Sequence, residues 1–217
     1  MKTSKETLPL YHFSENGEWA SIGVLPSEIS REGQAPRQGG LLMIHSSFGS
    51  FSHHWSSCGM DFRRFLGKID VSYFASKVRG AEAEVFDPER TRTAVLALAE
   101  EIAEEVRSGE IPGVAPEDLE ADLETLRDFA DEIEEGWTTS HFLNELATLS
   151  FDHAEVDFSS LGERVLHTRL DPQIAQFWAT FWPALIEELS DEMAAEMATE
   201  QVCDDADKPA PISRMKR

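Results

Sequence analysis

The chain has 217 residues, of which 41% are hydrophobic, and its 13 Phe and five Trp can build a substantial core. Its formal net charge of −22 argues against nucleic acid and anionic membranes as direct ligands. Two cysteines give no disulfide framework, and neither a signal peptide nor an apolar run long enough to cross a bilayer is present, so we expect a soluble, cytoplasmic protein.

The first predicted elements are two strands joined by a tight turn. Leu8–Ser14 and Trp19–Val24 have the composition of strands, and Asn16 and Gly17 between them supply the positive φ angles of a type I′ turn. A polar loop rich in Gly, Pro and Gln is expected over Pro26–Gly40.

A second hairpin is expected over Leu41–Ser47 and Phe51–Ser57, with Gly49 and Ser50 as its turn. Strict alternation then gives one apolar face (Leu42, Ile44, Phe48, Phe51, Trp55) and one polar face (His45, Ser47, His54, Ser56). In this register His45 and His54 lie opposite each other. Zinc needs three or four convergent ligands, and no paired ligand motif accompanies them, so we expect no metal and no cofactor.

Two short helices should follow the hairpins. Phe62, Phe65 and Leu66 share one helical side, and Asp70 is placed as the N-cap of a helix that ends at Gly80. Residues 1–80 are therefore predicted to form an antiparallel sheet of about four strands with short helices, close to neutral in charge.

Beyond Gly80 the charge changes sharply, from nine Lys/Arg and seven Asp/Glu before it to ten and 34 after it. Asp87-Pro88 begins a predicted helix with Val95, Leu98, Ile102 and Val106 as its buried stripe. A second helix is expected over Pro116–Glu135, ending at Gly136, with Leu119, Leu123, Leu126, Ala130 and Ile133 buried. The two helices are expected to pair antiparallel.

The remaining pattern predicts a helix over Thr139–Leu149 and a strand or loop over Phe151–Phe158. Asp171-Pro172 begins a long helix, which Pro183 should kink or divide. The predicted fold class is α+β, with a sheet region over residues 1–80, an acidic helical region over 81–200 and a disordered tail over 201–217.

The acidic helices are the candidate site. Ten carboxylates over a 20-residue helix are spaced about 3 Å apart along its axis, and one strand of duplex DNA carries a charge about every 3.4 Å. A basic nucleic-acid-binding groove is therefore the expected partner, and a solvated helix face is the alternative. The candidate contact residues are Glu100, Glu101, Glu104, Glu105, Glu117, Glu120, Glu124, Asp128, Asp131 and Glu132.

Two other interpretations of the sequence are an aromatic docking surface and an enzyme. Phe177, Trp178, Phe181 and Trp182 form an aromatic block that suits a docking surface, although such a stripe is more often core. No nucleophile with a base and an orienting partner is present, and no phosphate loop or dinucleotide motif occurs, so we do not expect an enzyme.

One segment resembles a known group of proteins. Phe51, Trp55, Gly59, Phe62, Phe65, Leu66, Tyr73 and Lys77 follow a pattern similar to that of small phage and prophage accessory proteins, over residues 49–80. This resemblance implies a phage origin and brings acidic anti-CRISPR and anti-restriction inhibitors into consideration. The resulting hypothesis is a non-enzymatic inhibitor that mimics nucleic acid in a defence complex of the bacterial host; the alternative is an adaptor that binds through an apolar or aromatic surface.

Overall fold

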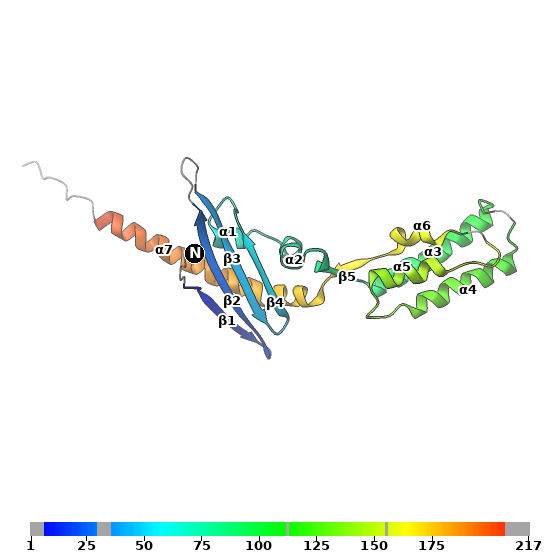
Figure 1. The fold of residues 1–217 in the computed structure, drawn as a ribbon, viewed down its shortest axis with the longest axis horizontal. Helices are drawn as coiled ribbons and strands as arrows, with labels where there is room; N and C mark the ends of the chain where they lie inside the picture. Colours follow the sequence, from blue (N-terminus) through cyan, green and yellow to red (C-terminus); the bar gives the residue numbers. More distant parts are fainter. Residues whose placement is uncertain (1–6, 30–35, 112, 155, 207–217) are drawn as a thin grey trace, which may run out of the picture. The chain divides into compact units, whose positions relative to one another are not determined.

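The computed structural model describes residues 7–29, 36–111, 113–154 and 156–206 (Figure 1). Contacts divide the chain into two compact units. Residues 1–80 and those from 172 onward form the sheet unit, and residues 81–171 form the acidic unit. A four-stranded antiparallel sheet and a mainly helical region confirm the predicted α+β class.

The sheet unit contains a meander of four antiparallel strands in the order β1-β2-β3-β4: β1 (Leu10–Glu15), β2 (Glu18–Ile29), β3 (Arg37–Ser46) and β4 (Gly49–Trp55). The first hairpin is confirmed, because Asn16 (φ 52°) and Gly17 (φ 87°) form the turn between Glu15 and Glu18.

The predicted loop over Pro26–Gly40 is wrong at both ends, because β2 continues to Ile29 and β3 starts at Arg37; residues 30–35 lie outside the described part. Gly39 and Gly40 are strand residues beside crowded neighbours. A Cβ at Gly39 would meet the Trp55 carbonyl, and one at Gly40 would meet the Phe62 ring. These glycines therefore permit close packing within the sheet unit, which is a common reason for glycine in a strand.

The second hairpin turns at Ser47 and Phe48, two residues earlier than predicted, since Ser46 pairs with Gly49. The Ser46 hydroxyl donates to the Gly49 carbonyl (2.9 Å), and the Phe48 ring lies 6.0 Å from that of Phe181 in the core. The register moves by an even number of residues, so the predicted faces are kept. The facing pairs change, however: His45 lies opposite Ser50 and not opposite His54, whose partner is Leu41.

In the part of the sheet unit that the structure describes, three helices accompany the strands: α1 (Phe62–Leu66), α2 (Val71–Arg79) and α7 (Pro172–Ala206). The predicted N-cap is confirmed, because the Asp70 carboxylate accepts from the Tyr73 N–H, and Gly80 (φ 61°) ends α2. The core is rich in aromatic rings from the strands and the helices, among them Phe51, Trp55, Phe62, Phe74, Phe177, Phe181 and Trp182. The aromatic block of α7 is therefore mainly core.

Helix α7 differs from its prediction in three respects. It is continuous through Pro183, so the proline does not divide it; the buried residues Trp182 and Leu185 hold the chain on both sides of this position. It runs to Ala206, so the predicted tail starts too early, and residues 207–217 lie outside the described part. It also belongs to the sheet unit, whereas the predicted acidic region extended to residue 200.

The described residues of the acidic unit form four helices: α3 (Pro88–Ser108), α4 (Pro116–Glu132), α5 (Thr139–Thr148) and α6 (Phe158–Val165). It also has a short 3₁₀ turn, η1 (Gly80–Ala83), and two strands, β5 (Glu84–Phe86) and β6 (Thr168–Leu170), which pair antiparallel and were not predicted. Strands of three residues carry too little alternation for a pattern to detect. Helix α4 ends three residues before its predicted end, and the described residues between α5 and α6 form a loop.

Helices α3 and α4 pair antiparallel, as predicted. Arg92 near the start of α3 donates to the Ala130 carbonyl (3.0 Å) and to the Ile133 carbonyl, so it satisfies free acceptors at the end of α4. The core between the elements of this unit is largely aliphatic, and Leu98, Ile102, Leu123 and Leu126 are buried in it.

Candidate acidic interface

The net negative charge of the chain is concentrated in the acidic unit. Residues 81–171 contain six Arg and no Lys against 25 Asp/Glu, a formal net charge of −19, while the sheet unit has 13 Lys/Arg against 16 Asp/Glu, a net charge of −3. The charge boundary therefore follows the structural units. Carboxylates at this density must remain hydrated at the surface, where they repel one another.

The arginines of this unit offset only a few of its carboxylates. Arg107 pairs with Glu104 (3.2 Å) and Arg169 with Glu135 (3.0 Å). Arg92 pairs with Glu89 (3.2 Å) while it caps α4. In the part of the unit that the structure describes, these cations are already engaged, so most carboxylates have no internal counter-charge.

The ten predicted contact residues lie on the surface of α3 and α4: nine are exposed, and Glu105 is half-buried. They do not share one face. The structure separates most of them into three groups: the junction of α3 and α4, the outer face of α4, and the flank of α3 that faces α6.

At the junction, Arg127 of α4 connects two of the predicted residues. Its guanidinium lies 2.6 Å from a Glu120 carboxylate oxygen and 3.8 Å from one of Glu100. The hydrogen bond that Arg127 donates to Glu120 raises the pKa of the Arg127 guanidinium, so this cation stays charged. Glu100 and Glu120 are therefore partly neutralised and less available to a partner than the sequence suggested.

The outer face of α4 carries the most available charge. Glu117, Glu124, Asp128 and Asp131 follow one another at intervals of seven, four and three residues, which places them on one helical face. All four are exposed, and none forms an ion pair with another described residue. We call these four residues the α4 stripe; Glu132 lies beside it.

The spacing of the α4 stripe corrects the sequence-based value. Fourteen residues rise about 21 Å, so its charges are about 7 Å apart along the axis, roughly twice the 3.4 Å of one DNA strand. The predicted spacing of about 3 Å counted carboxylates on every face of a longer helix. It also included Asp122, which is buried, and Glu134 and Glu135, which lie beyond the end of α4.

On the other flank of α3, Arg164 of α6 donates to both carboxylate oxygens of Glu101 (2.8 Å each). This pair borders a cavity of about 200 Å³ that is also lined by Glu105, Asp157 and apolar residues such as Ile102 and Val156. Hydrogen bonds from Ser159 lower the pKa of Asp157, which keeps that carboxylate ionised. The cavity is smaller than the roughly 300 Å³ at which small-molecule sites begin.

Asp122 has a role that the sequence analysis missed. Its side chain is buried and accepts hydrogen bonds from the backbone N–H groups of Asp152 (2.9 Å), His153 (3.2 Å) and Ala154 (2.9 Å). It therefore holds the loop between α5 and α6 against α4. The sequence did indicate a buried position for this residue, because Asp122 lies between Leu119 and Leu126 on the apolar stripe of the helix.

The histidines of the second hairpin do not converge. The ring of His45 forms a hydrogen bond with Ser50 (Nδ1 to Oγ, 2.9 Å) and lies edge-on to Trp19. Among the described residues, no group of three or more His, Cys, Asp or Glu side chains is placed to hold a metal ion.

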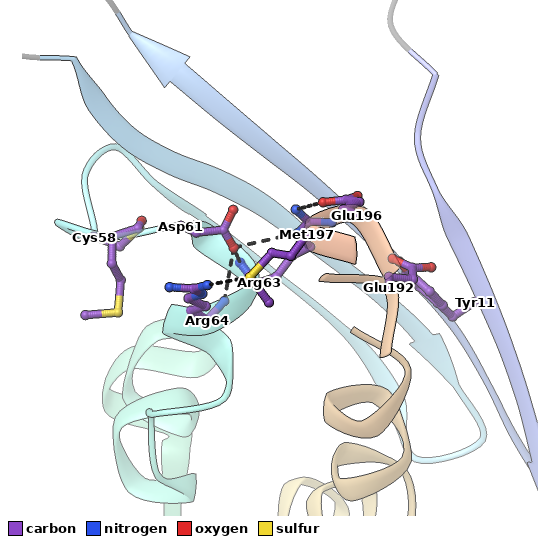
Figure 2. Close-up of polar contacts among 9 residues, drawn as sticks. Tyr11, Cys58, Asp61, Arg63, Arg64, Glu192, Glu196 and Met197 are labelled. Carbon is purple, nitrogen blue, oxygen red and sulfur yellow. Dashed lines mark hydrogen bonds and ion pairs between the residues drawn. The ribbon is translucent and has the colours of Figure 1, made fainter. Parts of the chain in front are cut away.

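A second polar cluster lies in the sheet unit (Figure 2). Arg63 of α1 donates to both carboxylate oxygens of Glu196 on α7 (2.7 Å each), and the Tyr11 hydroxyl donates to Glu192 (2.8 Å). The bond to Glu196 raises the pKa of Arg63. Because these contacts are satisfied within the unit, the cluster holds the later part of α7 to α1 and β1.

Comparison with known proteins assigns the chain to a protein family. The model of a phage family, Phage_phiTE_072, matches residues 1–205. No curated protein and no solved structure gives a significant match. The family match confirms the expected phage origin, and no described helix is both long and apolar enough to span a membrane.

Proposed function

Because this chain belongs to the Phage_phiTE_072 phage family, we propose that it is a non-enzymatic inhibitor whose acidic unit occupies a nucleic-acid-binding groove of a host defence complex. The observation that carries the proposal is the exposed α4 stripe in a unit of net charge −19. A groove built to bind phosphates attracts such a surface for the same electrostatic reason.

Three features support this proposal over a merely solvated helix face. The charge is confined to one structural unit, whereas a need for solubility alone would place it over the whole chain. Five of the six arginines in the described acidic unit are already bound to carboxylates, so a partner meets surplus negative charge. The stripe is presented by a helix that is packed on α3 and anchored through Asp122.

The aromatic block of α7 is not available as the binding surface of an adaptor. Phe177, Phe181 and Trp182 are buried in the sheet unit and are not available to a partner. An adaptor role would therefore need another apolar surface, and its binding would resist salt.

Charge reversal tests the proposal. A variant with Glu117→Lys, Glu124→Lys, Asp128→Lys and Asp131→Lys removes the α4 stripe without touching the Glu120–Arg127 pair. Its matched control reverses four exposed carboxylates of the sheet unit, through Glu15→Lys, Glu187→Lys, Glu188→Lys and Asp191→Lys. Both variants have the same net charge, so only the location of the changes differs.

Wild-type and variant proteins would be immobilised and exposed to lysates of bacteria that carry diverse defence systems, then washed at low and high salt. We expect the wild type and the control to retain a nucleic-acid-binding complex that is released at high salt. The stripe variant should capture at least about tenfold less of this complex. Equal capture by the stripe variant, or capture that resists salt, would contradict the proposal.

A further inference from the structure

Most of the outer face of the four-stranded sheet has no formal charge. One row across it contains Leu10, Gly23, Met43 and Ser52, and the adjacent row contains two histidines and two serines. Over four such rows, from the one that holds Trp19 to the one that holds Leu41, no Asp, Glu, Lys or Arg occurs. In a chain in which 28% of residues are charged, this is a marked local depletion.

The same face exposes large apolar side chains. Leu10 is 51% exposed, Met43 46% and Trp19 41%, and the residues that line a hollow of about 390 Å³ include Leu8, Leu10, Met43, His45 and Ser50. The opposite face of the sheet is the buried one, with Ile22 and Ile44 in its core. Depletion of charge together with exposed aromatic and Met side chains is typical of the centre of a protein interface.

We propose that this outer face is the contact between two copies of the chain, packed sheet against sheet. A chain of net charge −22 repels its own copies, and the repulsion is greatest between acidic units. The uncharged face of the sheet unit, whose net charge is only −3, is the surface on which two copies meet with the least repulsion.

The area of the face is compatible with a weak dimer. Four strands about 4.8 Å apart and four rows about 7 Å apart cover about 500 Å². Two such faces provide about 1,000 Å² before the relief of the side chains is counted, which is close to the lower limit of specific interfaces. Sheets pack face to face at about 10 Å, so the exposed Leu, Met and Trp side chains would fill the layer between them.

The inferred self-association does not depend on the proposed function. The two kinds of binding are distinguished by their opposite dependence on salt concentration. Salt screens the repulsion between two polyanions, so self-association should strengthen as ionic strength rises. Capture of a basic partner should weaken under the same change. A dimer would also carry two acidic units, which raises the apparent affinity for a target with two grooves.

Sedimentation equilibrium of the full chain, over a wide concentration range and at two salt concentrations, tests the inference. We expect a monomer–dimer equilibrium in the wild type, and Met43→Lys and Leu10→Glu should each raise the dimer dissociation constant at least about tenfold, because a buried unpaired charge is costly. Met43→Lys makes the chain less negative. If general charge repulsion alone controlled association, this variant would lower the dissociation constant instead of raising it.

Leu96→Glu is the matched control, because Leu96 is a similarly exposed (39%) leucine in the acidic unit. It adds the same charge as Leu10→Glu and should leave the dissociation constant within about twofold of wild type. Circular dichroism checks that each variant is folded, and the two face variants stand in for each other if one is not. A wild type that stays monomeric at every concentration, or a control that dissociates as much as the face variants, would overturn the inference.

Discussion

The two units of this protein differ in how they distribute charge. The acidic unit concentrates a net charge of −19 in 91 residues, whereas the 126 residues of the sheet unit carry only −3. A strongly charged surface suits electrostatic recognition, and an uncharged one suits apolar association. The proposed binding to a basic groove and the proposed contact between two copies both follow from that contrast.

The two cores differ as well. In the sheet unit, aromatic rings such as Phe74 and Phe177 (centroids 6.0 Å apart) fill the space between the sheet and its helices. In the acidic unit, small residues of α3 and α4 such as Ala99, Ala103 and Ala130 are buried in the core, and small buried side chains allow packed helices to approach closely. Each unit therefore has its own complete hydrophobic core.

The largest expected effects come from removing the centre of either core. Phe177→Ala should cost the sheet unit about 3–5 kcal/mol, and Leu126→Ala should cost the acidic unit about 2–5 kcal/mol, because both side chains are fully buried. Hydrogen exchange measured by mass spectrometry would locate the loss of protection within one unit. Leu96→Ala, at an exposed position, should stay within about 0.5 kcal/mol of wild type. Equal loss of protection in both units would show that they unfold as one.

A smaller effect is expected from Asp122, which separates structural from interface carboxylates. Asp122→Ala leaves three backbone N–H groups without their acceptor and should cost about 2–3 kcal/mol in unfolding free energy. Asp128→Ala, on the exposed α4 stripe, should change it by less than about 0.5 kcal/mol. Equilibrium unfolding in urea compares them, and equal stability of the two variants would refute the anchoring role of Asp122.

The smallest effect concerns Tyr11 in the sheet unit. Burial and the hydrogen bond to Glu192 raise the pKa of Tyr11 from 10.0 to about 12. The neutral phenol is thus favoured in the folded state, so its contribution to stability is complete below pH 10 and is lost as pH rises from about 10 to about 12. Tyr11→Phe should remove the part of the decrease in unfolding free energy that Tyr11 causes between about pH 10 and about pH 12. Unfolding free energy measured as a function of pH tests this. An unchanged pH profile in the variant would contradict the assignment.

Much of the local structure could be predicted from the sequence. Asp87-Pro88 starts α3 as expected, with the Asp87 carboxylate bonded to the Arg90 N–H, and Asp70 caps α2 in the same way. Asn16-Gly17 forms the first turn. These features depend on neighbouring residues alone, so a local pattern is sufficient to find them.

The candidate site could be predicted only in outline. The acidic helices were identified, but only the structure assigns Glu120 and Glu101 to Arg127 and Arg164, and gives the α4 stripe no such partner among the described residues. The uncharged outer face of the sheet was not recognised, because it is formed by residues from four strands whose register depended on the second turn.

The sequence by itself determined the α+β class, the starts of the helices other than α6, the first turn and the excess of acid after residue 80, because each depends on composition or on residues close in the chain. Tertiary structure decided the rest. The ring of Phe48 packs near that of Phe181 at the second turn, α7 joins the sheet unit through its aromatic residues, and Asp122 points inward to hold a distant loop. Each of these outcomes depends on a contact between residues 30 or more positions apart, and a local pattern contains no information about such contacts.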